Sequence, residues 1–199
     1  HFVSGSDIQD SIYIDALRNL GAVVSIGHKE ENLPDNVDTV IVSTAIKESN
    51  PELVKARKLG LKIYHRSDLL KEIAESAQNS KKCFIGFAGT HGKTTTSGMA
   101  SYVLDKSKLE SAFVVGGIVP EINTNAQHKS GNHFTAELDE SDGTLIKYHP
   151  DILVINNLEE DHLDFYKNGM EDIIKVFNQA ISHFIKRIEF NFNIIILFF

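Results

Sequence analysis

The sequence has a single cysteine, no excess of positive charge and no long hydrophobic run. Cys83 lies inside an apolar stretch, so disulfides are not expected and a reducing, cytoplasmic location is favoured. The net charge of −7, without a basic cluster, argues against a nucleic-acid partner. The longest apolar run, residues 194–199, is far too short to span a bilayer, and no signal peptide is found. We therefore expect no membrane insertion.

The length of 199 residues allows one large domain or two small ones. A content of 42% hydrophobic and 24% charged residues is typical of a globular chain. The sequence begins with His1 rather than Met, and residues 190–199 are strongly apolar. Such an ending is either a strand without its partner layer or a segment that is not native coding sequence. We interpret the chain as a fragment.

The most informative stretch, residues 86–96, joins an apolar strand to the start of a helix. It reads Gly-Phe-Ala-Gly-Thr-His-Gly-Lys-Thr-Thr-Thr. Small residues let backbone N–H groups approach a polyphosphate, and a helix N-terminus adds partial positive charge. Lys93 could reach the terminal phosphates, and the Thr94 hydroxyl could hold Mg²⁺. The stretch predicts binding of ATP or a close relative.

The match to the general phosphate loop is imperfect, because Phe87 stands where the pattern has its first glycine. The alternative is a glycine turn that merely ends a strand. It explains Gly89 and Gly92 but not Lys93 followed by three threonines. β-Branched residues lower helix propensity, so their presence at a helix start favours a functional hydroxyl.

Elsewhere, strand-like and helix-like segments alternate, which predicts parallel sheets covered by helices. The polar stretch 78–82 suggests a boundary between domains at 1–79 and 80–199. After a polar loop, we expect a helix ending at Gly21 with four inward residues, namely Ile12, Ala16, Leu17 and Leu20. Further helices are expected from Pro51 to about residue 60 and at 67–77, 94–104 and 171–185. Strands are expected at 22–26, 37–42 (buried on both faces), 61–64, 83–88, 112–115, 133–138 and 152–156, with a turn at Gly116–Gly117 and a loop over 120–132.

Two acidic clusters follow apolar strands. The first covers residues 137–142, Glu-Leu-Asp-Glu-Ser-Asp, and the second covers 156–162, Asn-Asn-Leu-Glu-Glu-Asp-His. Ligands of parallel α/β folds bind beyond the carboxyl ends of the strands, so both clusters should converge on the phosphate loop. Carboxylate and imidazole groups opposite a triphosphate suit Mg²⁺-assisted phosphoryl transfer. For either cluster by itself, a solvated loop is the favoured interpretation, but convergence with a phosphate loop reverses that preference.

Together these motifs resemble those of the Mur ligases. The resemblance rests on residues 89–96, 136–142 and 157–164, with weaker similarity at 4–7, 27–28 and 43–46. It implies a Rossmann-like N-terminal domain with a parallel sheet, followed by an incomplete P-loop α/β domain. The family's glycine-rich turn at the start of the first domain is absent here, as is its C-terminal domain. Because that domain closes over the site, we expect this polypeptide by itself to have little or no ligase activity.

The resemblance implies an ATP-dependent ligase of peptidoglycan synthesis. Such an enzyme joins L-alanine to UDP-N-acetylmuramate through an acyl phosphate. Three alternatives are a ligase that attaches a recycled murein peptide to the same nucleotide sugar, a non-catalytic nucleotide-binding remnant, and a generic phosphate-loop kinase or GTPase. The last is disfavoured because no guanine-recognition or lid motif is found.

Site residues are carried over from the resemblance position by position. Lys93 would neutralise phosphate charge, and Thr94, Glu140 and His162 would hold Mg²⁺, with Glu137 as the alternative carboxylate. Asn157 would contact the γ-phosphate. The remaining nucleotide-binding positions would be Gly89, Thr90, His91, Gly92 and Thr95, and the UDP moiety would contact Asp7, His28, Ser43 and Thr44.

Overall fold

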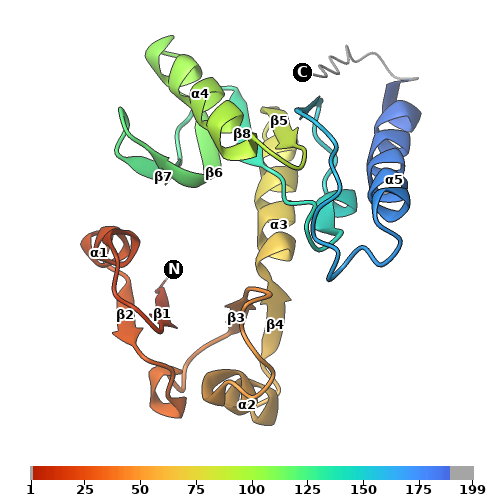
Figure 1. The fold of residues 1–199 in the computed structure, drawn as a ribbon. Coiled ribbons are helices and arrows are strands. Elements are labelled where there is room, and N and C mark those ends of the chain that lie inside the picture. The colour runs from red at the N-terminus through yellow and green to blue at the C-terminus, as the bar shows by residue number, and fades with distance from the viewer. Residues whose placement is uncertain (1, 189–199) are drawn as a thin grey trace. The chain divides into compact units, whose positions relative to one another are not determined.

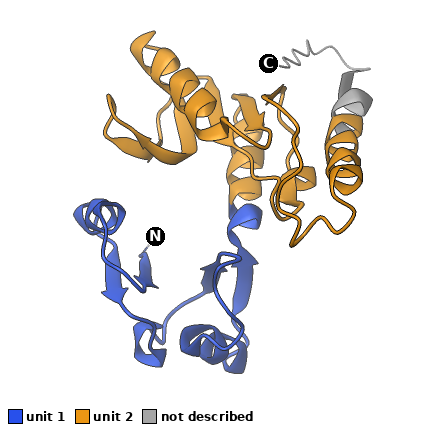
Figure 2. Ribbon diagram, in the orientation of Figure 1, with its two compact units in different colours: residues 1–69 blue, residues 70–199 orange. Residues whose placement is uncertain are grey.

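A computed structural model describes residues 2–188, and the chain divides into two compact units, residues 1–69 and 70–199 (Figure 2). The apolar ending at 190–199 lies outside the described residues. Both units combine parallel strands with helices, as the alternating sequence pattern predicts, so the α/β fold class is confirmed.

The first unit contains two separate pairs of parallel strands, β1–β2 and β3–β4 (Figure 1). In chain order its elements are β1 (Ser4–Asp7), α1 (Ile12–Asn19), β2 (Val23–Ile26), the 3-10 helix η1 (Glu30–Asn32), β3 (Thr39–Val42), α2 (Pro51–Lys58) and β4 (Lys62–His65), with α3 (Arg66–Asn79) running into the second unit.

Three expectations for this unit are wrong. Ser6 and Asp7, expected in the polar loop before the first helix, belong to strand β1, because the backbone of Ser4–Asp7 pairs with β2. Helix α1 buries Ile14, which was not on the expected inner face. The four residues expected there, Ile12, Ala16, Leu17 and Leu20, are all exposed. Strand β3 is not buried on both faces: Thr39 and Ile41 are exposed, since β3 pairs with β4 only.

Helix α2 begins and ends as its sequence predicts. The Asn50 side chain accepts hydrogen bonds from the backbone N–H groups of Glu52 (2.9 Å) and Leu53 (3.2 Å). Pro51 takes the first helical position, where a missing N–H costs nothing. After the helix, Gly60 has a φ of +66°, a left-handed conformation that ends helices.

The second unit is built on a five-stranded sheet with the order β7-β6-β8-β5-β9. All neighbours are parallel except β6 and β7. Its elements are β5 (Cys83–Ala88), α4 (Lys93–Lys106), β6 (Ala112–Val119), β7 (Thr124–Gln127), β8 (His133–Glu137), the 3-10 helix η2 (Thr144–Lys147), β9 (Ile152–Ile155) and α5 (Met170–Ile188).

Two predictions around β6 are corrected. Gly116 and Gly117 continue strand β6 instead of forming a turn, and the register of β6 against β7 shifts between Val114 and Val119. The segment expected to be a loop, 120–132, contains β7, which pairs antiparallel with β6. β7 is rich in polar residues and lacks a hydrophobic alternation. It is a strand because its backbone pairs with that of β6, not because of a local sequence pattern.

The sheet of the second unit carries helices on both faces (Figure 1). Phe84 and Ala88 of β5 share a core with Ala74 of α3 and Phe177 of α5. Side chains alternate between faces along a strand, so Ile85 of β5 lies on the opposite face, beside α4. The phosphate loop therefore starts from a strand that is packed on both sides.

The domain boundary at residue 79 stays a prediction. Packing divides the chain ten residues earlier, at Leu69. The cause is α3, whose Leu70, Ala74 and Ala77 pack against the core of the second unit. The apolar residues of α3 thus determine where the two compact units divide, while the polar stretch 78–82 marks only the end of α3.

Phe84→Ala is expected to lower the free energy of unfolding by about 3–5 kcal/mol. Phe84 is fully buried and its ring centroid lies 5.4 Å from that of Phe134. The matched control is Phe165→Ala, because the Phe165 ring is 49% exposed; its loss should be about 1 kcal/mol. Urea unfolding of both variants tests this, and equal losses would contradict the assigned core.

Candidate active site: a phosphate loop facing two carboxylates

The phosphate loop is a turn between β5 and α4. At two of its positions the backbone conformation requires glycine. Gly89 and Gly92 have φ values of +129° and +78°, in the left-handed region. A Cβ atom on Gly89 would lie 3.0 Å from backbone atoms of Asn157. The loop thus packs tightly against the chain that follows β9, and its backbone follows the path that the sequence motif predicts.

Lys93 is held at the loop by three hydrogen bonds. Its Nζ donates to the carbonyl oxygens of Gly89 (2.7 Å) and Thr90 (3.2 Å) and to Oε1 of Glu140 (2.9 Å). The two side chains are 14% and 2% exposed, so the ion pair is largely shielded from water. This contact brings together two residues predicted to act at one site, 47 positions apart.

Glu140 has one satisfied and one unsatisfied carboxylate oxygen. Oε2 is buried and has no hydrogen-bond partner among the described residues. Burial raises the pKa of Glu140, and the hydrogen bond from Lys93 only partly opposes that shift. The Tyr166 hydroxyl donates to the backbone carbonyl of Glu140, and burial raises the pKa of Tyr166 to about 12. A buried, unpaired carboxylate oxygen is a natural ligand for a cation.

Glu137 contacts the other key residue of the loop. Its Oε1 accepts a hydrogen bond from the Thr94 hydroxyl (2.9 Å), and its Oε2 accepts one from the backbone N–H of Gly116 (2.7 Å). The two candidate carboxylates thus contact different residues of the loop. Glu137 lies at the hydroxyl expected to hold Mg²⁺, and Glu140 lies at the lysine.

The chain after β9 holds the loop from the other side. Asn157 accepts from the backbone N–H of His91 (2.9 Å) and donates to the carbonyl of the same residue (3.1 Å). Asn156, which the sequence analysis did not assign, donates to the His91 carbonyl (3.2 Å) and to the Thr96 hydroxyl (3.0 Å). Thr90 accepts from the backbone N–H of Glu159 (2.9 Å). In the sequence, the one indication that Asn156 contacts the loop is its position next to Asn157.

Among the described residues, the His162 side chain contacts only Asp161, which belongs to the same loop. Its Nε2 is 3.9 Å from Asp161, and its backbone has a φ of +53°. The loop is tethered to the site through Tyr166, whose N–H donates to the His162 carbonyl (2.9 Å). Within residues 2–188, no three His, Cys, Asp or Glu side chains are grouped to hold a metal. The roles of His162 and Glu140 as metal ligands remain predictions.

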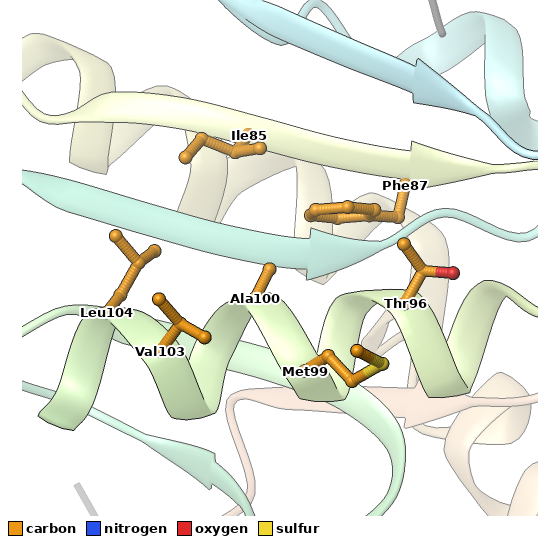
Figure 3. Close-up of a pocket in the computed structure, with 7 residues that line it drawn as sticks. All are labelled: Ile85, Phe87, Thr96, Met99, Ala100, Val103 and Leu104. Atoms are coloured by element: carbon orange, nitrogen blue, oxygen red, sulfur yellow. The ribbon is translucent and has the colours of Figure 1, made fainter. Parts of the chain in front are cut away.

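A groove between α4 and β5 is apolar (Figure 3). Its lining residues are Ile85, Phe87, Thr96, Met99, Ala100, Val103 and Leu104. Apart from one hydroxyl it offers no polar group for a phosphate. Charged substrate groups therefore belong at the loop itself, where N–H donors and Lys93 are found.

The residues predicted to contact UDP fall at two places in the first unit. Asp7 is the last residue of β1 and His28 lies two residues after β2, and the backbone N–H of Gly27 donates to the Asp7 carbonyl (2.7 Å). Ser43 and Thr44 follow β3, in the other strand pair. Ser6 and Glu52, which the sequence analysis left out, contact the His28 ring. Over the described residues, none of the helices is long and apolar enough to cross a membrane.

The fold is that of an α/β protein with a glycine-containing loop between β5 and α4, and comparison with known proteins identifies its family. The model for the Mur ligase middle domain matches residues 87–191, and the model for the Mur ligase family, catalytic domain, matches residues 1–78. The chain belongs to the Mur ligase family.

Similar proteins agree with this assignment. The chain is 44% identical over 177 residues to the UDP-N-acetylmuramate–L-alanine ligase of Carboxydothermus hydrogenoformans, covering 89% of this chain and 37% of that protein. The crystal structure of the UDP-N-acetylmuramate–alanine ligase of Thermotoga maritima matches 99% of this chain and 43% of its own, with a TM-score of 0.85 and 29% identity. The chain spans between a third and two fifths of the curated relatives' length.

Glu140→Gln is expected to change how stability depends on pH. Since burial raises the pKa of Glu140, the folded state holds this proton more tightly than the unfolded chain. The stability that the folded state gains from holding this proton is fully present below the ordinary glutamate pKa of 4.5. It is lost as the pH rises through the raised pKa of Glu140. In urea unfolding between pH 4.5 and pH 7, the free energy of unfolding of the variant should increase relative to that of the parent as the pH rises. A constant difference over that range would contradict the burial of Glu140.

Proposed function

We propose that the chain is part of an ATP-dependent ligase that joins L-alanine to UDP-N-acetylmuramate. The observation that carries the proposal is the phosphate loop with Lys93 paired to Glu140 and Thr94 paired to Glu137. The 44% identity to a ligase named for this reaction supports the choice of substrates. A cytoplasmic location is part of the proposal, because the chain has one cysteine and ATP is a cytoplasmic substrate.

In this proposal the phosphate loop binds ATP. The backbone N–H groups at the start of α4 face the phosphates, and Lys93 neutralises their charge. Lys93 already forms an ion pair with Glu140, so phosphate oxygens would compete with that carboxylate for Nζ. Asn156 and Asn157 both donate to the His91 carbonyl in the loop, and this contact supports a role for Asn157 at the terminal phosphate.

The residues present fit a magnesium ion. The Thr94 hydroxyl and Glu137 are 2.9 Å apart, and Glu140 adds the buried oxygen that lacks a partner among the described residues. Mg²⁺ commonly takes one or two carboxylates together with waters and substrate phosphates, so a cage of three acidic or histidine ligands is not required. Glu137, Thr94 and Glu140 would hold the ion, with His162 as a further candidate. The bound ion would spread the charge that develops during phosphoryl transfer.

The chemical task is to make a carboxylate reactive. A carboxylate is a poor electrophile. Attack of a carboxylate oxygen on the γ-phosphate of ATP releases ADP and creates an acyl phosphate, which has a good leaving group. The amine then attacks the carbonyl carbon, and phosphate departs as the amide bond forms. Lys93 stabilises negative charge during the first step by electrostatic interaction. In the first unit, Asp7, His28, Ser43 and Thr44 would bind the UDP portion.

A second candidate is a ligase for a longer amine substrate. The structure of the UDP-N-acetylmuramate:L-alanyl-γ-D-glutamyl-meso-diaminopimelate ligase from Neisseria meningitides matches 91% of this chain with a TM-score of 0.78 and 26% identity. A nucleotide-binding remnant without catalysis is the third. Transfer of labelled phosphate from ATP to an acyl phosphate, measured with and without each amine, separates the three.

Lys93→Ala is expected to weaken ATP binding by about 10- to 100-fold, because it removes a charged donor to phosphate. Lys106→Ala is the matched control, since Lys106 ends the same helix and lies over the Tyr102 ring. Calorimetric titration with Mg–ATP gives both affinities. Unchanged affinity in the Lys93 variant would refute the phosphate-loop assignment.

Glu137→Gln is expected to lower the affinity for Mg²⁺ in the presence of ATP by about 10- to 100-fold. The amide keeps the shape of the side chain but removes the charge beside Thr94. Glu121→Gln removes an exposed carboxylate of the same unit and should leave Mg²⁺ affinity unchanged. Titration of the nucleotide complex with Mg²⁺ measures the effect. Equal behaviour of the two variants would exclude Glu137 from the metal site.

A further inference from the structure

Three side chains of the first unit form a hydrogen-bonded cluster around His28. The Ser6 hydroxyl donates to Oε1 of Glu52 (2.6 Å) and lies 2.9 Å from Nδ1 of His28. The same Nδ1 is 3.3 Å from Oε1 of Glu52. The His28 and Glu52 side chains are only 20% and 15% exposed. Of the three, only His28 was predicted to contact UDP.

The fold brings these residues together from three elements. Ser6 lies in β1, and His28 follows the paired strand β2, after Gly27 at a φ of +85°. Glu52 is the second residue of α2, where the Asn50 cap fixes the first turn. A carboxylate at this position is stabilised by the partial positive charge of the helix N-terminus.

Counting protons in the cluster determines the state of the neutral imidazole ring. A serine hydroxyl has one proton, and here it points to the Glu52 carboxylate, which only accepts. The hydroxyl therefore has no proton left for Nδ1 of His28. Both neighbours of Nδ1 present lone pairs, so Nδ1 must carry the proton and donate it to them.

Asn32 completes the surroundings of Glu52. Its Nδ2 donates to the Gly27 carbonyl (2.8 Å) and to Oε1 of Glu52 (3.3 Å). Oε1 thus faces three donors, from Ser6, His28 and Asn32. Each of these groups can donate a hydrogen bond, and the oxygen is their common acceptor.

With Nδ1 protonated, the other ring nitrogen of neutral His28 carries a lone pair. Nε2 makes no hydrogen bond to any residue in the range 2–188 that the structure describes. A lone pair attracts N–H or O–H donors and repels the oxygens of a diphosphate. A lone pair at Nε2 would therefore favour the donor groups of a nucleotide sugar over its diphosphate.

We propose that Ser6 and Glu52 are positioning residues that hold His28 as its Nδ1–H tautomer, so that Nε2 accepts a hydrogen bond from the uridine portion of the substrate. The ligand half of this inference rests on the proposed function of the first unit. The tautomer half rests only on the cluster, which allows the two to fail separately.

Long-range ¹H–¹⁵N spectra of the full chain, labelled at histidine, test the tautomer. They are recorded at about pH 8, above the ordinary histidine pKa of about 6.5. The His28 signals are those lost in His28→Gln. Nδ1 is expected to have a protonated, pyrrole-type shift and Nε2 an unprotonated, pyridine-type shift. The reverse pattern, or protonation of both nitrogens, would overturn the proposal.

Three variants separate positioning from a merely structural role. Glu52→Ala frees the Ser6 proton to donate to Nδ1, so the Nε2–H tautomer should grow. Glu52→Gln keeps an oxygen acceptor and should retain the parent tautomer. Glu48→Ala is the control, because it removes an exposed carboxylate of the same unit that pairs with Arg57. A parent-like tautomer in Glu52→Ala would overturn the assignment of Glu52.

Titration with three probes tests the ligand half. UDP and uridine are expected to shift the Nε2 signal while it stays unprotonated, and inorganic pyrophosphate is expected to leave it unchanged. UDP affinity should fall about tenfold in Glu52→Ala. A response to pyrophosphate with protonation of Nε2 would overturn the uridine contact. If no probe moves the signal, contact between His28 and UDP is refuted, whatever the tautomer spectra show.

Discussion

The ion pair between Lys93 and Glu140 is the contact on which the candidate site depends. It joins the start of α4 to the chain after β8, and both side chains are largely removed from water. A buried charge without its partner is strongly unfavourable, so each side chain constrains where the other lies. The other oxygen of Glu140 is buried and has no hydrogen-bond partner in the part of the chain that the structure describes. The phosphate loop therefore comes with a carboxylate already facing it.

The strand order makes this arrangement possible. β5 lies between β8 and β9, and all three run parallel, so their carboxyl ends meet at one edge. The loop after β5 consequently has acidic residues on one side and the Asn156–Asn157 pair on the other. Residues more than forty positions apart become neighbours because two crossovers return the chain to the same edge. The first unit repeats the pattern on a smaller scale, where the ends of β1 and β2 meet the capped start of α2.

Much of the second unit could be predicted from local signals. Strand β5 was predicted with its observed bounds, because an apolar run ends there at a glycine turn. Less could be predicted where pairing partners decide the outcome. Polar β7 is a strand only because β6 runs beside it, and β3 is half-exposed because it has one neighbour. Amphipathic spacing in α1 suggested an inner face, but the packing selects Ile14.

By itself, the sequence determined the phosphate loop, the acidic clusters, the parallel α/β class and membership of the Mur ligase family. These features depend on residue types at short spacing, which a linear pattern contains. Only the tertiary structure decided which acid faces which loop residue: Glu137 contacts Thr94, and Glu140 contacts Lys93. It also brought Ser6 and Glu52 to the His28 ring from separate elements of the first unit. Such contacts depend on strand order and side-chain direction, and neither is encoded in local spacing.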